Sequence, residues 1–522
     1  MTQAIARAGL LGKAYAFEWP IRAILVIKMA MQSVSCESMR DLENTVFAIG
    51  HTPEALMQQA GERMAQSILR YFPHYSRATA YLGKGHNAGD ALVIARHLQY
   101  AGWELQLRCP YSLNELSPLT LKMFQALHGV SLDSSAPAPA GSLLIDGMLG
   151  IGASGPIRPP LADIALEINE TRDSMDCIVV ALDSPSGVNA DTGEIYSGAV
   201  RADHTLSVGY PKSGLLHSMS TSHVGAISQV VLDAFEEHPL ETASAAYQLI
   251  TPHTLSRRRR DFDTHKGQAG RVGIWAGSEG MLGAAVLTAT AALKSGAGLI
   301  TMFTPPALYP TLAPMLPPEI MVQSSITPLS MLERNFDALV LGPGIGNPPS
   351  DLANQLIELV EKSGVPTVLD ADILNLIARE QKHSVLHSKC ILTPHPGEMK
   401  RLHLSSGSRE ETAQDFCNLH SITLLLKGAR TIITAPGSPL FINSSGSPAM
   451  ATAGQGDVLS GLIGGLCAQG YSQIEACNLG AWLAGEAAQL AIASQAETEE
   501  TLTASSVIEF LHQAFLAVPR QA

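Results

Sequence analysis

Residues 81–98 read YLGKGHNAGDALVIARHL and join three local patterns. A short apolar run stops at a turn that carries Gly83, Gly85 and Gly89, and a helical pattern begins at Asp90. A glycine-rich turn between an apolar strand and a helix is typical of α/β sheets in which the N-terminus of the helix faces a ligand. The turn matches neither the dinucleotide fingerprint nor the P-loop, and it carries an acidic side chain. The stretch therefore predicts an α/β fold with a ligand site at a strand end, and it leaves the ligand open.

The rest of the chain repeats this alternation of apolar strands and helices. The first half predicts strands at 78–83, 104–109, 143–146, 177–183, 204–209 and 226–233, and the second half at 271–277, 299–304, 336–341, 367–372, 390–393 and 423–427. Continuous apolar strands separated by helices are typical of parallel sheets that are covered on both faces. Residues 236–262 are polar and lack a sustained period, which indicates a boundary. We therefore expect an extension at 1–32, a first domain at 33–240, a linker at 241–252 and a second domain at 253–522.

Composition excludes several classes of function. The chain has 522 residues and a formal net charge of −13, which argues against nucleic acid or an anionic membrane as a partner. Its 7 cysteines form no CxxC pair, so neither a zinc site nor a disulfide framework is indicated, and a cytoplasmic protein is expected. The apolar segment 21–31 is too short to span a bilayer. We expect it to belong to an extension, unless translation begins at Met29 or Met31, and a signal peptide is the less favoured alternative.

The stretch MATAGQGDVLSGLIGGL, residues 450–466, indicates phosphoryl transfer. Gly454 and Gly456 allow close backbone approach, and Asp457 opens a helix whose free N–H groups form an anion hole. A carboxylate beside that hole can take a proton from an attacking hydroxyl while the hole stabilises the transferred group. Had this turn stood alone, an ordinary N-cap aspartate would be the preferred interpretation.

Four further motifs accompany it in the second half. They are HKGQAGRVGIWAGSEGMLGAA at 265–285, VLGPGIGN at 340–347, LTPHPGEM at 392–399 and LLLKGARTII at 424–433. In this order, and over about residues 253–522, they resemble the ADP- or ATP-dependent NAD(P)H-hydrate dehydratases of the ribokinase-like superfamily. The resemblance implies magnesium and ADP or ATP as phosphoryl donor. The enzyme would phosphorylate the hydroxyl of a hydrated nicotinamide ring and eliminate the phosphate, which restores NAD(P)H.

The resemblance also implies site residues for the second half. Asp457 would be the catalytic base, and hydrated NAD(P)H would contact Ala284, Gly344 or Gly346, His395 and Asp457. The nucleotide would contact Lys427, Gly428, Ala429, Arg430, Thr431 and Gly456. The chain reads AMATAGQGD where the family turn reads GMATGGSGD, so Ala449, Ala453 and Gln455 depart from it. We expect activity with an altered nucleotide affinity.

The first half resembles a companion domain that is often fused to that dehydratase. The opening turn is similar to a GxGNNGGDG motif, IDGMLGIGASGP at 145–156 to a DALFGTGL-type loop, and ALDSPSGVNADTG at 181–193 to DxPSGxxADTG. Together these motifs, across about residues 33–240, resemble the NAD(P)H-hydrate epimerases. The resemblance implies a Rossmann-like three-layer sandwich that precedes a ribokinase-like domain, so the fold class is two doubly wound α/β domains.

Oxygen chemistry suggests what the opening turn holds. Asn87, Asp146 and Ser186 offer hard oxygen ligands at strand ends, which suit an alkali or alkaline-earth cation rather than zinc. The resemblance implies that this cation is potassium. Epimerisation needs an acid or base near the hydrated carbon, for which Asp183 is the first candidate and Asp146 the second. The residues expected to line the hydrated nucleotide are His86, Asn87, Ala88, Gly89, Asp90, Gly150, Ile151, Gly152, Ala153, Ser154, Gly155, Pro156 and Asp183.

Departures in the opening turn keep an alternative open for the first half. His86 replaces an asparagine of the family motif, while Ala88 and Ala91 replace glycines. If those glycines have φ > 0, alanine there costs about 1 kcal/mol, and its methyl group could crowd the ligand. The first half would then be a binding module without catalysis, beside a small-alcohol kinase of the ribokinase-like group. The TPHPGE element and the fused first half favour the repair enzyme, which acts on the small molecules NADHX and NADPHX with ADP or ATP as a homo-oligomer.

Overall fold

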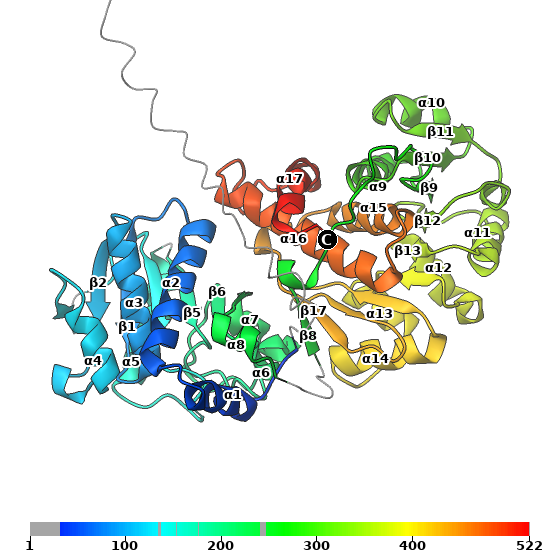
Figure 1. The fold of residues 1–522 in the computed structure, drawn as a ribbon. Coiled ribbons are helices and arrows are strands. Elements are labelled where there is room, and N and C mark those ends of the chain that lie inside the picture. The colour runs from blue at the N-terminus through cyan, green and yellow to red at the C-terminus, as the bar shows by residue number, and fades with distance from the viewer. Residues whose placement is uncertain (1–31, 134–136, 153, 176, 241–246, 521–522) are drawn as a thin grey trace, which may run out of the picture.

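The computed structural model describes residues 32–133, 137–152, 154–175, 177–240 and 247–520, which build two sheets (Figure 1). Both sheets are dominated by parallel strands with helices on their faces, so the expected doubly wound α/β class is confirmed. Residues 1–31, Ala153 and the first half of the expected linker, residues 241–246, lie outside the described residues.

The first sheet has seven strands, and all its pairs are parallel. In spatial order they are β3 (Leu132–Asp133), β2 (Glu104–Arg108), β1 (Arg77–Leu82), β4 (Leu143–Gly147), β5 (Ile178–Leu182), β6 (His204–Val208) and β7 (Ala226–Val230). The helices of this domain are α1 (Cys36–Ala48), α2 (Pro53–Tyr71), α3 (His86–Tyr100), α4 (Pro118–Gln125), α5 (Leu161–Ser174), α6 (Ser213–Leu216), α7 (Thr221–Val224) and α8 (Asp233–Glu237). The order reverses between β1 and β4, and ligands of such sheets bind at this switch point.

The second sheet has ten strands and also reverses its order, between β9 and β12. In spatial order they are β11 (Met321–Ser324), β10 (Leu299–Thr304), β9 (Arg271–Trp275), β12 (Ala338–Leu341), β13 (Thr367–Leu369), β14 (Cys390–Leu392), β15 (Thr423–Leu426), β16 (Ile432–Thr434), β17 (Leu440–Asn443) and β8 (Tyr247–Ile250). The helices are α9 (Leu282–Lys294), α10 (Tyr309–Leu312), α11 (Ser350–Lys362), α12 (Asp372–Arg379), α13 (Pro396–Leu402), α14 (Arg409–His420), α15 (Gln455–Ala468), α16 (Gln473–Ala493) and α17 (Ala504–Ala517). Only β16 pairs antiparallel to its neighbours.

Each sheet separates two hydrophobic clusters, which gives both domains three layers. In the first domain, α1 to α4 pack on one face and α5 on the other. In the second, α9, α15, α16 and α17 cover one face, and α11 to α14 cover the other. The small-residue helices α15 and α16 lie in this core, and no helix of the described chain is long and apolar enough to cross a membrane. All 7 cysteines lie among the described residues, are buried and form no disulfide there.

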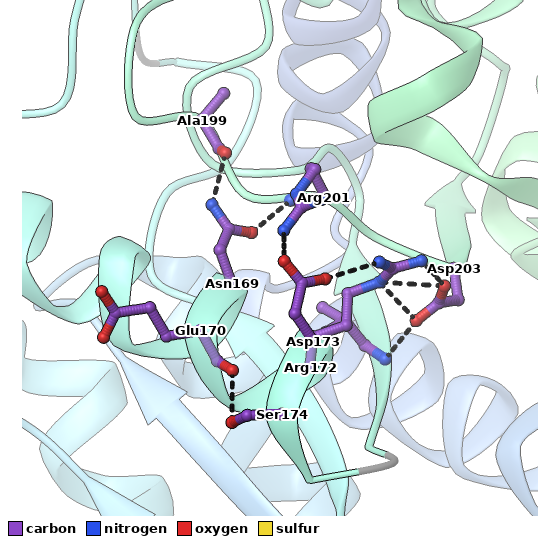
Figure 2. A network of polar contacts seen from close by, with 9 residues as sticks. Asn169, Glu170, Arg172, Asp173, Ser174, Ala199, Arg201 and Asp203 are labelled. Carbon is purple, nitrogen blue, oxygen red and sulfur yellow. Dashed lines mark hydrogen bonds and ion pairs between the residues drawn. The ribbon is translucent and has the colours of Figure 1, made fainter.

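Polar contacts join α5 to the segment that leads into β6 (Figure 2). The Asn169 amide donates to the Ala199 carbonyl at 2.9 Å and accepts from the Arg201 N–H at 2.9 Å. Arg172 Nε donates to both Asp203 carboxylate oxygens at 3.1 Å, and Arg201 pairs with Asp173. These contacts fix the chain between the loop after β5 and the start of β6.

Several strands are not indicated by the sequence pattern because each is only two to four residues long. They are β3, β8, β11, β16 and β17. The strand β8 lies within the range expected as a linker and pairs in parallel with β17, so residues 247–250 extend the second sheet. The expected strand 367–372 ends at Leu369, and residues 370–372 turn out of the sheet instead.

Candidate active sites

The first site forms at the switch point between β1 and β4. Tyr81 pairs with Asp146, and Leu82 with Gly147, so both strands end at the same level. A Cβ at Gly83 would lie 2.0 Å from the Met148 carbonyl oxygen, which explains why the turn after β1 needs glycine. The helix α3 begins at His86, earlier than the Asp90 start that the sequence pattern predicts, so Gly89 lies inside the helix.

Asp146 is the centre of a buried polar network. Its carboxylate accepts hydrogen bonds from the Ser186 N–H and hydroxyl, both at 2.8 Å, and from the Met148 N–H at 3.2 Å. The Ser186 hydroxyl accepts from the Leu149 N–H at 3.1 Å, and the Asn87 amide donates to the Leu149 carbonyl at 3.0 Å. The three expected cation ligands are therefore brought together. Burial raises the pKa of Asp146 to about 6, against the opposing effect of its hydrogen bonds from Ser186 and Met148.

This environment fits a cation. Among the described residues, no lysine, arginine or histidine forms an ion pair with Asp146, so its negative charge is buried without a counter-charge. An isolated buried carboxylate is costly unless a cation or proton neutralises it. Oxygen donors from a carboxylate, an amide and a hydroxyl are the ligand set that hard cations prefer.

The alanines of the opening turn do not carry the expected strain. Ala88 and Ala91 lie inside α3, and neither is among the described residues with positive φ. Both side chains are fully buried in the core of the first domain, and a Cβ at Gly147 would lie 2.6 Å from the Ala91 Cβ. The methyl of Ala91 therefore packs against β4. The concern that these substitutions disable the first site through backbone strain is wrong.

Asp183 follows β5 and is held in a left-handed conformation, with φ of 63°. Its carboxylate accepts from Lys212 Nζ at 2.5 Å and from the Val208 N–H at 3.1 Å. Lys212 is 1% exposed and also donates to the Val208 carbonyl at 2.8 Å. The lysine has no recognisable motif around it, so the sequence gives no signal for it.

Two further carboxyl groups lie near this ion pair. Burial, followed by the charges of Asp183 and Glu43, raises the pKa of Asp90 well above its ordinary value. Burial and the charge of Asp183 likewise raise the pKa of Glu43. Neighbouring carboxyl groups can supply one proton donor and one proton acceptor. The loop 150–156 adjoins this site through Gly150, whose Cβ would lie 3.6 Å from the Asn87 Cβ.

The second site forms at the switch point between β9 and β12. The glycine turn after β12 has positive φ at Gly344 (62°) and Gly346 (66°). A Cβ at Gly344 would lie 2.8 Å from the Ala284 Cβ, so the two residues expected to contact the hydrated nucleotide adjoin each other. The Gly346 N–H donates to Asp372 at 2.8 Å, which joins the turn to the next strand end.

Lys427 and Asp457 approach each other at the start of α15. A Cβ at Gly456 would lie 3.1 Å from Lys427 Nζ, and Lys427 donates to Asp370 at 2.7 Å. Burial, followed by the negative charge of Asp370, raises the pKa of Asp457 to about 6, while Lys427 opposes the shift. The protonation of Asp457 therefore changes close to neutral pH.

Asp370 is a site residue that the sequence analysis misses. It is 1% exposed, and its second carboxylate oxygen accepts from the Ser460 hydroxyl at 2.7 Å. The next residue, Ala371, has φ of 53° and ψ of −115°, a conformation that costs a non-glycine residue of order 1–3 kcal/mol. This turn places Asp370 and Asp372 on either side of a sharp bend at the carboxyl end of β13.

The other predicted residues of the second site differ in their exposure and in their hydrogen-bond partners. His395 caps α13 by accepting from the Gly397 N–H at 2.9 Å, and its side chain is 51% exposed. Thr431 donates to the Gly428 carbonyl at 3.1 Å, which closes the loop after β15. Arg430 is 2% exposed, and its guanidinium donates to the Gly225 carbonyl of the first domain at 2.8 Å. Its side chain thus points toward the other domain.

The fold and the two sites define a two-domain α/β enzyme, with an acid–base site in the first domain and a phosphoryl-transfer type of site in the second. A family model described as NAD(P)H-hydrate dehydratase matches residues 272–510, and one described as YjeF-related protein N-terminus matches residues 53–214.

Relatives match almost the whole chain. The bifunctional NAD(P)H-hydrate repair enzyme of Moorella thermoacetica is 35% identical over 495 residues, which are 87% of this chain and 91% of that protein. The same enzyme from Synechocystis is 33% identical and covers 92% and 94%. An ADP/ATP-dependent NAD(P)H-hydrate dehydratase from Bacillus subtilis, crystallised with ATP and Mg²⁺, is 27% identical with a TM-score of 0.44, and the match covers 51% of this chain and 97% of that one. The chain belongs to the family of bifunctional NAD(P)H-hydrate repair enzymes.

Proposed function

We propose that the second domain dehydrates hydrated NAD(P)H at the expense of ADP or ATP, and that the first domain epimerises the R and S forms of the hydrate. The observation that carries the proposal is Asp457 at the start of α15, beside Lys427 and with a pKa of about 6. Family membership supports the same pair of activities. A small-alcohol kinase shares the GxGD turn but has no use for the fused first domain.

In the dehydratase site, Asp457 would take the proton from the ring hydroxyl of the hydrate. The hydroxyl oxygen would then attack the terminal phosphorus, and the bond from that phosphorus to the bridging oxygen would break, which releases AMP from ADP or ADP from ATP. The N–H groups at the start of α15 would stabilise the transferred group. Elimination of the phosphate from the ring carbon, together with a proton from the neighbouring carbon, restores the dihydronicotinamide ring. Lys427, held by Asp370, is positioned to neutralise the phosphoryl oxygens next to Gly456.

The charges of this site fit a divalent cation. The negative charges of Asp370 and Asp372 both contribute to the raised pKa of Asp457, and Lys427 is the cation that opposes them. Magnesium bound by one or two carboxylates and by the phosphates would supply the missing positive charge. Asp372 is the proposed protein ligand, because Asp370 is already occupied by Lys427 and Ser460 and Asp457 is the proposed base.

In the epimerase site, Asp183 is the proposed acid–base residue for the hydrated carbon. Lys212 would orient it through their ion pair, and Asp90, whose pKa burial raises well above its ordinary value, would be the neighbouring proton donor. We propose that Asn87, Asp146 and Ser186 bind potassium, and that the loop 150–156 covers the nucleotide. We also propose that the first domain spans residues 33–240 and that the second domain begins before β8. We propose a cytoplasmic location for the protein.

Potassium is expected to stabilise the protein only above pH 6. Burial raises the folded-state pKa of Asp146 to about 6. The contribution of this carboxyl group to the stability of the fold is therefore fully present below its unfolded-state pKa, and it is lost as pH rises through 6. Bound potassium offsets that loss. We expect potassium to raise the melting temperature by a few degrees at pH 8 and to have little effect at pH 5. Thermal unfolding with tetramethylammonium as the control cation measures this, and an equal potassium effect in Asp146→Asn would contradict the ligand assignment.

The test of the whole function is recovery of dihydronicotinamide absorbance from mixed hydrated NADH epimers, with magnesium and either ADP or ATP. Full, rapid recovery that requires a nucleotide supports both activities. A rapid half followed by slow drift indicates a dehydratase without an epimerase. No nucleotide-dependent recovery, together with phosphorylation of a small alcohol, would overturn the proposal in favour of the kinase.

A further inference from the structure

Two arginine side chains connect the loop after β15, residues 427–431, with the first domain. One belongs to α14 and the other to the loop itself. Arg409, at the start of α14, donates to the Lys427 and Arg430 carbonyls, each at 3.2 Å. A Cβ at Gly428 would lie 2.6 Å from the Arg409 guanidinium, so the loop passes directly over it. Arg409 also donates to the Ser218 hydroxyl of the first domain at 3.3 Å.

Two more contacts connect the same elements. The Ser218 N–H donates to Glu410, which is 4% exposed, at 2.8 Å. Arg430, the fourth residue of the loop, donates to the Gly225 carbonyl at 2.8 Å. Burial lowers the pKa of Arg430 to about 10. Three side chains of the loop and of α14, those of Arg409, Glu410 and Arg430, thus contact residues 217–225, which contain the short helical turn Ser218–Ser220 and α7.

We propose that residues 217–225 of the first domain position the loop Lys427–Thr431 and so set the nucleotide affinity of the second domain. This inference rests on the proposed function of the second domain. Ser218 and Gly225 are positioning residues. They hold Arg409 and Arg430, which fix the loop carbonyls and thereby the place of Lys427 beside Gly456. Part-buried hydrogen bonds to charged groups are strong enough for such control, because losing one can change a dissociation constant about tenfold.

The linkage is reciprocal. If docking of the first domain favours nucleotide binding, bound nucleotide must favour docking by the same factor. The substitution Ser218→Pro removes both the N–H that Glu410 accepts and the hydroxyl that Arg409 uses. Proline is tolerated at the first position of a helical turn, and His217 has φ of −69° and ψ of 140°, which suits a residue before proline. The variant therefore tests the contacts without a clash at the backbone.

The experiment measures the dissociation constants of Mg·ADP and Mg·ATP for the full-length chain by calorimetry. We expect Ser218→Pro to weaken binding about tenfold and Ser218→Ala, which keeps the N–H, about threefold, with the epimerase rate unchanged. The matched control is Arg70→Met, which breaks a different contact between the domains, the 2.7 Å pair with Glu486. It should change the dissociation constants less than twofold.

Three outcomes decide the proposal. Weaker nucleotide binding in the two Ser218 variants, with a raised KM for nucleotide and an unchanged kcat, supports it. Unchanged binding in Ser218→Pro, or an equal loss in Arg70→Met, overturns it and leaves the proposed function intact. A wild-type chain that binds neither nucleotide overturns both, so the two failures are distinguishable at the first measurement.

Discussion

Asp457→Asn is expected to lower the kcat of nucleotide-dependent dehydration by about 10²–10⁴-fold, the range that a positioned general base contributes. The substitution keeps the size of the side chain but removes its ability to take the proton from the ring hydroxyl. Since Lys427 and Gly456 remain in place, the affinity for Mg·ADP should change far less than kcat. Single-turnover dehydration of the S epimer, with nucleotide binding measured separately, checks this result.

The pH dependence gives a second readout for the same residue. Burial and the charge of Asp370 raise the pKa of Asp457 to about 6. The wild-type kcat should therefore fall as pH drops through 6, and the residual activity of Asp457→Asn should lack this pH-dependent step. A carboxyl whose folded pKa is raised loses stability as pH rises through that pKa. The variant should therefore unfold at a higher temperature than wild type at pH 8.

The matched control is Asp415→Asn, the same change of charge at an exposed position of α14. It should retain wild-type kcat. If Asp457→Asn kept more than a tenth of the wild-type kcat, Asp457 would not be the base, and the role would pass to another carboxyl of the site. A lower melting temperature in Asp457→Asn would instead attribute the loss of activity to misfolding.

The sequence predicts the positions of both sites because parallel sheets bring the carboxyl ends of their strands to one edge. Glycine turns after β1, β9 and β12 mark the strand ends at the two switch points, and their patterns are visible along the chain. Ala284 and Gly344, separated by many residues, adjoin each other for this reason. Asn87, Asp146 and Ser186 meet at the first switch point in the same way.

What the sequence could not predict depends on contacts between distant segments. Asp370 lies at the end of an apolar run and resembles a continuation of the strand, because nothing local shows the strained bend at Ala371. Lys212 follows β6 without a motif, and its role appears only when β5 and β6 place it beside Asp183. Arg430 belongs to a recognisable loop, but the direction of its side chain is decided by the docking of the two domains.

Asp183→Asn is expected to remove epimerisation and spare dehydration. Asp183 is the proposed acid–base residue, so the epimerase rate should fall by about 10²–10⁴-fold. Mixed hydrated NADH epimers would then recover half of their absorbance rapidly, and the remaining half would follow at the rate of uncatalysed epimerisation. The S epimer alone should be consumed at the wild-type rate, because the second site keeps all its residues.

Folding has to be separated from chemistry in this variant, because Asp183 pairs with the buried Lys212, and breaking a buried pair costs about 3–5 kcal/mol. Asp191→Asn is the matched control. It lies in the same loop and accepts a hydrogen bond from the Cys36 N–H at 2.6 Å, but it has no contact with Lys212. It should lose some stability and keep the epimerase rate. A wild-type rate of epimerisation in Asp183→Asn would contradict the assignment. A folded but inactive Asp183→Asn, together with an active Asp191→Asn, would locate the proton transfer at the ion pair of Asp183 and Lys212.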